Sequence, residues 1–211
     1  MSEPRPPEIA IVDYGVGNIG SIINMLNRVK AESGVARTSK EIRQAQKLIL
    51  PGMGSFDHAA ASLDRSGLRA VLEGRVLKDR IPILGICLGM QILCKKSEEG
   101  SLPGLGWIEA EVIRFKIPRN SPLKVPHIGW NDLSVRKPLP ILQGITLEDR
   151  YYFAHSYHLT GLDQDYVLAE TEYGYAFPSV IQSRNIYGIQ CHPEKSHQSG
   201  MKFLRNFVES G

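Results

Sequence analysis

Only three cysteines, Cys87, Cys94 and Cys191, occur among the 211 residues. None belongs to a CxxC pair or to a Cys/His spacing typical of zinc sites, so no metal site is predicted. An odd number of cysteines without a secretory signal indicates free thiols in a reducing compartment, and we predict a cytoplasmic protein. Cys87 and Cys94 are not expected to form a disulfide, because seven residues of one predicted helix separate them by about 10 Å.

Long apolar runs and runs of like charge are also lacking. No stretch approaches the roughly 20 apolar residues that cross a bilayer, so no membrane association is predicted. The formal net charge is only +3 and the basic residues are scattered, which argues against binding to nucleic acid. Repeats, low-complexity segments and convincing linkers are missing too. We therefore predict a single domain over residues 1–211, with residues 1–8 as a frayed lead-in.

Strand-like and helix-like patterns alternate in the first half of the chain. Apolar runs at 9–13, 48–50 and 81–86 are typical of buried strands, and segments with helical spacing of apolar residues follow them. This order predicts an α/β fold, a doubly wound and mostly parallel sheet with helices on both faces. The second half predicts additional antiparallel strands and then a C-terminal helix after the polar segment 195–200. The extended segments lie at 106–115, 130–135, 151–155, 166–172, 179–183 and 186–191.

Cys87 lies between a predicted strand and a predicted helix, in Gly85-Ile86-Cys87-Leu88-Gly89-Met90-Gln91. The thiolate form is favoured at a helix N-terminus, because unpaired backbone N–H groups face it. Glycines two residues before and two residues after the cysteine let other backbone approach a tight turn, as in the G-x-S-x-G nucleophile elbow. We interpret Cys87 as a nucleophile, and a buried structural cysteine is the alternative.

A second polar element, Cys191-His192-Pro193-Glu194, follows the last predicted strand. A cysteine nucleophile needs a histidine as base and a third group that orients the histidine. His192 and Glu194 can supply both, and the alternative is a surface turn. Cys191 is the less attractive nucleophile and is expected to pack as a small apolar residue, because it lies late in an apolar strand.

Two glycine-rich loops follow other predicted strands. In Pro51-Gly52-Met53-Gly54 a backbone N–H can turn toward a ligand, which suits one half of an oxyanion hole with the N–H of Leu88 as the other half. A plain strand-ending turn is the alternative. Residues 15–20 match G-x-G-x-x-G, but no acidic residue ends the next strand, so a dinucleotide site is disfavoured. We interpret this loop as a tight turn that presents Asn18.

Together these stretches resemble the class-I (triad) glutamine amidotransferases, and the Cys and His-x-Glu motifs carry that resemblance. Within the class, further stretches resemble the glutaminase subunits of imidazole glycerol phosphate synthases of histidine biosynthesis. These stretches lie at 13–18, 51–54, 126–131, 152–157 and 192–196. The resemblance covers about residues 9–208 and implies the flavodoxin-like fold of this class.

The resemblance implies hydrolysis of glutamine to glutamate and ammonia without a cofactor. Cys87 is expected to attack the amide, His192 to move the proton and Glu194 to fix the tautomer of His192. The other implied roles are an oxyanion hole from Gly52, Met53 and Leu88, glutamine binding by Gln91, Ser156 and Tyr157, partner contacts by Asn18, Tyr152 and Lys195, and support near the site by His127 and Trp130.

The resemblance also implies a heterodimer with a (β/α)8 cyclase, which uses the ammonia to make imidazole glycerol phosphate and an aminoimidazole carboxamide ribotide. The oxyanion strand of the family often rearranges when the partner binds its substrate, and Gly52 and Gly54 would keep such a flip low in energy. Three alternatives stay open. They are a related glutaminase that feeds a cyclase-like partner in surface-sugar synthesis, a cysteine peptidase or related hydrolase of the same superfold, and a non-enzymatic binding subunit.

Overall fold

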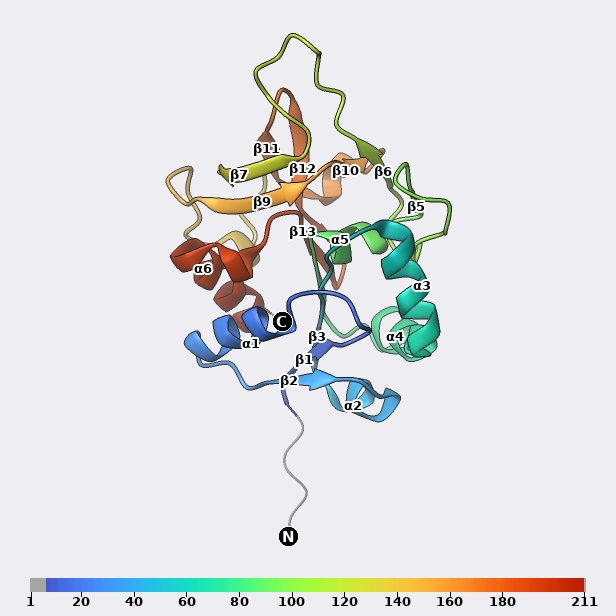
Figure 1. The fold of residues 1–211 in the computed structure, drawn as a ribbon. Helices are drawn as coiled ribbons and strands as arrows, with labels where there is room; N and C mark the ends of the chain where they lie inside the picture. Colours follow the sequence, from blue (N-terminus) through green and yellow to red (C-terminus); the bar gives the residue numbers. More distant parts are fainter. Residues whose placement is uncertain (1–6, 211) are drawn as a thin grey trace.

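An eight-stranded sheet runs through the middle of the protein in the computed structural model, which describes residues 7–210 (Figure 1). The strand order is β2-β1-β3-β4-β13-β12-β11-β8. The first five strands are parallel, and the last three run antiparallel to their neighbours. This confirms the predicted mostly parallel sheet with antiparallel strands from the C-terminal half. The predicted lead-in lies outside the described residues, apart from residues 7 and 8.

The main sheet consists of β1 (Ile9–Val12), β2 (Ser33–Ala36), β3 (Lys47–Leu50), β4 (Ile83–Ile86), β8 (Ser134–Val135), β11 (Val167–Glu172), β12 (Ala176–Ser183) and β13 (Ile186–Ile189). Two smaller sheets contain β5 (Lys96–Ser97), β6 (Glu111–Arg114) and β10 (Tyr157–Thr160), and β7 (His127–Asn131) and β9 (Tyr151–His155). The α-helices are α1 (Ile19–Arg28), α2 (Ser39–Gln44), α3 (Phe56–Ser66), α4 (Arg69–Glu73), α5 (Leu88–Ile92) and α6 (His197–Glu209). Single turns of other helix types are η1 (Gly74–Lys78), η2 (Pro140–Leu142), η3 (Gln164–Tyr166) and η4 (Pro193–Lys195).

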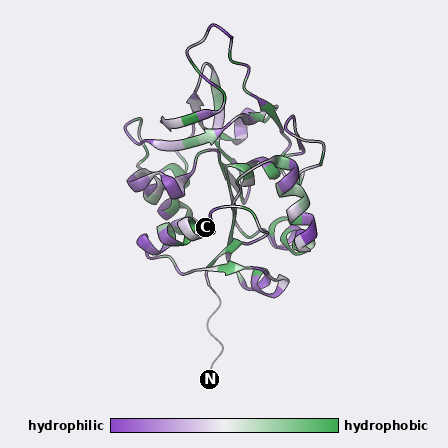
Figure 2. Cartoon of the chain, viewed as in Figure 1, coloured by the Kyte–Doolittle hydropathy of each residue, from purple (hydrophilic) through white to green (hydrophobic). Residues whose placement is uncertain are grey.

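Helices cover both faces of the parallel strands (Figure 1). In β1, Ile9 and Ile11 pack in the layer that contains α1 and α6, whereas Ala10 and Val12 pack in the layer that contains α2, α3 and α4. A strand that is buried on both faces needs apolar residues at successive positions, which explains the uninterrupted apolar run of β1. Figure 2 shows the same arrangement, with hydrophobic strands inside and hydrophilic residues on the outer sides of the helices.

Several elements differ from the sequence-based expectations. β2 and α2 were not predicted, because β2 is an edge strand with only Ala36 buried and has no apolar run. A capping box between Thr38 and Glu41 opens α2 and is the sequence signal that could have revealed it. The expected segment 130–135 divides between β7 and β8, which belong to different sheets. The C-terminal helix begins at His197, inside the stretch expected to precede it.

The carboxyl ends of β1, β3, β4 and β13 meet at one edge of the sheet, beneath the ribbon of β7 and β9 (Figure 1). Binding sites of open α/β sheets lie at this edge. The loops that follow these strands hold residues 13–17, 51–54 and 87 and the segment after Cys191, as the sequence predicts. Within the described residues, no helix is long and apolar enough to cross a membrane.

Candidate active site

Cys87 forms the sharp turn between β4 and α5. Its φ of 53° lies in the left-handed region, which is strained for any residue other than glycine. No side chain fits at the two flanking glycines. A Cβ on Gly85 would lie 2.7 Å from Met90 Cα, and a Cβ on Gly89 would overlap the carbonyl oxygen of Leu50. The geometry is therefore that of a nucleophile elbow, with Leu88 as the first residue of the helix behind the thiol.

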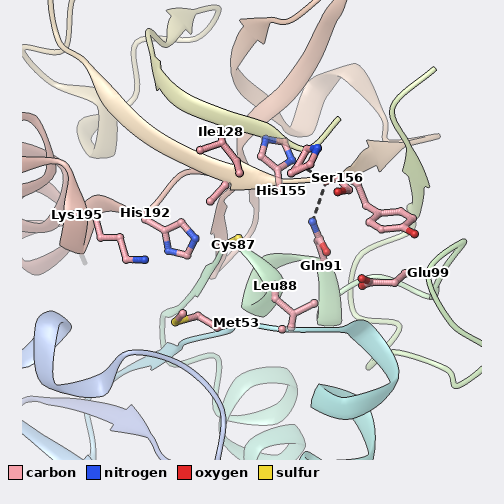
Figure 3. Close-up of a pocket in the computed structure, with 14 residues that line it drawn as sticks. Met53, Cys87, Leu88, Gln91, Glu99, Ile128, His155, Ser156, His192 and Lys195 are labelled. Carbon is pink, nitrogen blue, oxygen red and sulfur yellow. Dashed lines mark hydrogen bonds between the residues drawn. The ribbon is translucent and has the colours of Figure 1, made fainter. Parts of the chain in front are cut away.

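The parallel pairing of β4 with β13 brings the second polar element to Cys87. Ile86 pairs with Ile189, and the N–H of Cys87 donates to the carbonyl oxygen of Ile189 at 2.8 Å. His192 follows this pair by three residues, and its own N–H donates to the carbonyl oxygen of Tyr152 at 2.8 Å. The register of the two strands thus places the histidine beside the cysteine (Figure 3).

His192 links Cys87 to Glu194. Its Nδ1 lies 2.7 Å from Glu194 Oε1, and its ring lies next to the Cys87 side chain (Figure 3). Burial opposes the charged ring, but Cys87 and Glu194 raise the pKa of His192 to about 10. Glu194 Oε2 is buried and has no hydrogen-bond partner among the described residues, so His192 is the one side chain there to which the carboxylate is hydrogen-bonded. The protonated form of His192 is therefore favoured beside Cys87 and Glu194.

A cavity of about 240 Å³ opens in front of Cys87 (Figure 3). Eight of the sequence-predicted site residues line it, namely Met53, Cys87, Leu88, Gln91, Ser156, Tyr157, His192 and Lys195. Glu194 lies behind His192, while Gly52, Asn18 and Tyr152 do not line the cavity. Glu99, His155 and Ile128 line it as well but were not assigned roles from the sequence. Glu99 Oε2 accepts a hydrogen bond from the N–H of Phe56 at 2.8 Å, so its carboxylate is held at the wall.

Segment 51–54, which the sequence predicts to form part of an oxyanion hole, packs against the elbow. Gly52 is buried, and a Cβ there would overlap the backbone of Leu88 and Gly89. Met53 reaches the cavity, and Gly54 has a φ of 92° that favours glycine. The structure therefore brings Met53 and Leu88 together at the cavity wall and places Gly52 directly behind them.

Two amide side chains connect Cys87 to the far wall of the cavity. Gln190 Nε2 donates to Cys87 Sγ at 3.6 Å, and Gln91 Nε2 donates to Gln190 Oε1 and to the carbonyl oxygen of Tyr157, each at 3.0 Å. The sequence analysis did not single out Gln190. Its signal is a polar residue at the end of an apolar strand, and here it is fully buried.

Two buried histidines extend this network away from the cavity. His155 Nδ1–H donates to the carbonyl oxygen of Tyr157 at 2.8 Å, so His155 Nε2 accepts from His127 Nδ1–H at 3.2 Å. Asn131 Nδ2 then donates to His127 Nε2 at 3.4 Å and to the carbonyl oxygen of Glu172 at 2.9 Å. Burial lowers the pKa of His127 to about 4 and that of His155 to about 3, which matches neutral rings. His127 thus supports the cavity wall from behind.

Comparison with known proteins agrees with this geometry. The sequence matches the family Glutamine amidotransferase class-I over residues 10–210. The chain belongs to the class-I glutamine amidotransferases. It is 47% identical over 201 residues to Imidazole glycerol phosphate synthase subunit HisH 2 of Pseudomonas aeruginosa, covering 95% of this chain and 98% of that protein. It is also 47% identical over 202 residues to subunit HisH of Bdellovibrio bacteriovorus, covering 95% and 99%. Within its class, the amidotransferase therefore belongs to the HisH branch.

Solved structures show the same fold at lower identity. A crystal structure of a glutamine amidotransferase has a TM-score of 0.73 at 21% identity and covers 96% of this chain and 97% of its own. The structure of PurLQS from Thermotoga maritima has a TM-score of 0.71 at 17% identity and covers 97% and 98%. The fold of the amidotransferase is therefore that of solved class members.

Of the three residues expected to face a partner, Lys195 lines the cavity, whereas Asn18 and Tyr152 do not. In the amidotransferase, Asn18 caps α1 by accepting a hydrogen bond from the N–H of Ser21 at 3.3 Å. Lys195 Nζ lies 5.7 Å from the ring centre of Tyr152. Trp130 stacks on His197 at 5.4 Å and is half exposed. Trp130, Tyr152, His197 and Lys195 thus form a mixed aromatic and basic cluster that reaches the cavity through Lys195.

Proposed function

We propose that this HisH-branch amidotransferase hydrolyses glutamine to glutamate and ammonia and passes the ammonia to a (β/α)8 cyclase subunit in the cytoplasm, with residues 1–211 acting as one domain. The observation that carries the proposal is His192, which bonds Glu194 and lies next to Cys87 at the wall of a cavity that Gln91 also lines. A thiolate, a protonated base and an orienting carboxylate are the groups that acyl transfer to a cysteine needs.

The proposed chemistry proceeds in two steps. The Cys87 thiolate attacks the side-chain amide carbon of glutamine, and His192 donates its proton to the leaving nitrogen, which departs as ammonia. A γ-glutamyl thioester remains on Cys87. His192, now neutral, takes a proton from water as the water attacks the thioester, and glutamate leaves with the thiolate regenerated. Glu194 keeps His192 Nδ1 protonated throughout, so that the other ring nitrogen faces the reacting atoms.

The oxyanion formed in each step needs donors from the backbone. Leu88 is the first residue of α5, so its N–H has no acceptor within the helix. The segment of Gly52 and Met53 packs against it and supplies the second donor in our proposal. One such donor typically contributes about 10²–10³ to the rate.

Glutamine is held at its amino-acid end, on the side of the cavity away from His192. Gln91 uses its Nε2 for Tyr157 and Gln190, which leaves Gln91 Oε1 available to accept from the substrate ammonium group. The carboxylate of Glu99 lines the same side and supplies negative charge for that ammonium group. Ser156 and Tyr157 close this end of the cavity. We expect Glu99→Gln to raise KM for glutamine more than it lowers kcat.

The cyclase binds, in this proposal, over the mouth of the cavity. Met53, Ile128 and Trp130 are exposed there by 42%, 62% and 50%, and Met53 and Ile128 also line the cavity. Exposed apolar side chains next to basic and aromatic ones are typical of protein interfaces. A partner seated on them would cover the site from which ammonia leaves, with Asn18, Tyr152 and Lys195 in contact with it.

Glutaminase activity with and without the cyclase subunit and its ligand tests this function. We expect low activity of the isolated subunit, strong stimulation in the complex and no activity of Cys87→Ala. Cys94→Ala is the matched control, because Cys94 is buried away from the cavity. Unchanged turnover in Cys87→Ala, or release of amino acids from peptides by the isolated protein, would contradict the proposal. High activity without the cyclase would contradict the gating alone.

Binding to the cyclase tests the docking surface separately. We expect Trp130→Ala to weaken the complex about tenfold or more, because half-buried tryptophans at interfaces often carry much of the affinity. Leu147→Ala is the control, since Leu147 is 62% exposed but does not line the cavity. Calorimetric titration gives both dissociation constants, and equal values for the two variants would exclude this surface.

A further inference from the structure

Gln190 is fully buried next to the proposed nucleophile, and the strand pairing alone does not account for its side chain. Its backbone N–H donates to the carbonyl oxygen of Ser179 at 2.8 Å, as expected for a residue at the end of a sheet strand. Its carboxamide instead lies between Cys87 Sγ and Gln91 Nε2. A buried amide in such a place needs partners for both its ends, and these two groups provide them.

The orientation of the Gln190 amide follows from a backbone carbonyl. The Tyr157 oxygen can only accept, so the group of Gln91 that faces it must be the NH₂ group. The second hydrogen of that NH₂ group reaches Gln190, so the atom of Gln190 that faces Gln91 must be the oxygen. The NH₂ group of Gln190 therefore faces Cys87 Sγ at 3.6 Å. The hydrogen-bond partners thus fix the orientation of both amides, and a donor, not an acceptor, faces the sulfur.

We propose that Gln190 is a positioning residue that holds the sulfur of Cys87 through a donated hydrogen bond and ties it to Gln91. This inference rests on the proposed role of Cys87 as nucleophile. The donated bond is stronger to a thiolate than to a thiol, since bonds to charged acceptors are the stronger ones. Gln190 thereby favours the reactive form of the sulfur and keeps it directed at the cavity. The same amide fixes Gln91, so that nucleophile and substrate-holding residue move as one unit.

Alkylation of Cys87 by iodoacetamide tests the inference without glutamine and without a partner. Gln190→Met removes the donor at nearly constant volume, and Gln190→Glu keeps the shape but puts a carboxylate against the sulfur. We expect the alkylation rate at pH 7 to fall about tenfold in Gln190→Met and further in Gln190→Glu, with the pH profile of alkylation shifted upward in both. A packing role alone predicts the opposite order, because glutamate matches glutamine best in shape.

Two controls make the result specific. Cys87→Ala gives the background from Cys94 and Cys191, whose buried thiols have raised pKa values and react slowly. Gln182→Met and Gln182→Glu repeat the substitutions on β12, where Gln182 Nε2 bonds Tyr187 and Arg184. We expect wild-type alkylation rates from both Gln182 variants.

Wild-type alkylation in Gln190→Glu, or a Gln190→Glu rate equal to or above that of Gln190→Met, would overturn the inference. If the methionine variant does not fold, the alkylation rate of Gln190→Glu is compared with that of wild type at a temperature below the unfolding temperature of Gln190→Glu. A rate equal to that of wild type then overturns the inference. Failure of the proposed function would show differently, as wild-type protein that alkylates normally but releases no ammonia from glutamine in the presence of the cyclase.

Discussion

The hydroxyl of Tyr14, in the loop after β1, donates to the carbonyl oxygen of Pro51 at 2.6 Å in the segment that packs against Leu88. Burial raises the pKa of Tyr14, so the hydroxyl stays protonated and able to donate. A Cβ on Gly17 would lie 2.6 Å from Pro51 Cβ, so the whole loop is packed on this segment. The loop that presents Asn18 and the proposed oxyanion segment are therefore mechanically joined.

Tyr14→Phe should remove the hydrogen bond that connects the loop after β1 to the segment around Pro51. We expect the free energy of unfolding to fall by about 1–3 kcal/mol, because the Pro51 carbonyl loses a buried donor. The ratio of stimulated to basal glutaminase activity should fall as well, since the segment is no longer held to the loop. Urea titration and activity with and without the cyclase measure both effects. Tyr187→Phe is the control, and a wild-type stimulation ratio in Tyr14→Phe would refute the link.

Glu194→Gln should remove the charge that supports the His192 imidazolium. We expect kcat to fall by about 10²–10⁴ with little change in KM, by analogy with loss of the orienting carboxylate in other triads. Burial opposes the charged ring, while Cys87 and Glu194 raise its pKa to about 10. The charged His192 ring therefore contributes to the free energy of unfolding in full below the unfolded pKa of about 6.5. This contribution is lost as pH rises through 10.

The pH dependence of stability checks the same substitution. Wild-type unfolding free energy should decline between pH 6.5 and 10, and the decline should be shallower in Glu194→Gln. The exposed Glu148→Gln serves as control and should reproduce the wild-type curve. Equal slopes in wild type and Glu194→Gln would show that the carboxylate does not hold the charge of His192.

Gly52→Ala should disrupt the oxyanion segment. Its Cβ would overlap backbone atoms of Leu88 and Gly89, which cannot rotate away, so the segment must shift. We expect a loss of about 1–3 kcal/mol in the free energy of unfolding and a drop in glutaminase activity of about 10²-fold or more. Gly74→Ala, with no atom within 4 Å of the new Cβ, should leave both unchanged or slightly raise stability. Full activity in Gly52→Ala would exclude the segment from catalysis.

His127 and His155 should make the protein sensitive to acid. Burial lowers their pKa values to about 4 and about 3, so they stay neutral in the fold but take up protons near pH 6.5 when unfolded. The contribution of the two neutral histidines to the free energy of unfolding is therefore complete above pH 6.5. It falls as the pH decreases toward the pKa values of the folded state. His127 alone should contribute about 3 kcal/mol of this loss by pH 4.

Chemical unfolding at pH 7 and pH 4 measures this contribution. We expect His127→Gln to lose less stability than wild type between the two values. His58→Gln, on the exposed side of α3, should match wild type. If His127→Gln shows the full wild-type loss, the neutral histidine chain does not account for the acid sensitivity.

Local patterns in the sequence were enough for the parts of the site that lie close together along the chain. Continuous apolar runs identified β1, β3 and β4, because strands buried on both faces need them. The glycines around Cys87 indicated the elbow, and only Pro193 separates His192 from the carboxylate of Glu194. The edge strand β2 carried no such pattern, since one half-exposed strand leaves little apolar signal.

Tertiary structure decided the contacts between distant segments. Gln190 and Cys87 are 103 residues apart, and only the register of β4 with β13 makes them partners. His127 and His155 meet through the pairing of β7 with β9, across 28 residues. Periodicity and spacing describe neighbours along one element, whereas these contacts depend on which strands pair and in which register. The sequence by itself therefore determined the fold class and the residues that we propose as nucleophile and base, and the folded chain decided which buried amides and histidines surround them.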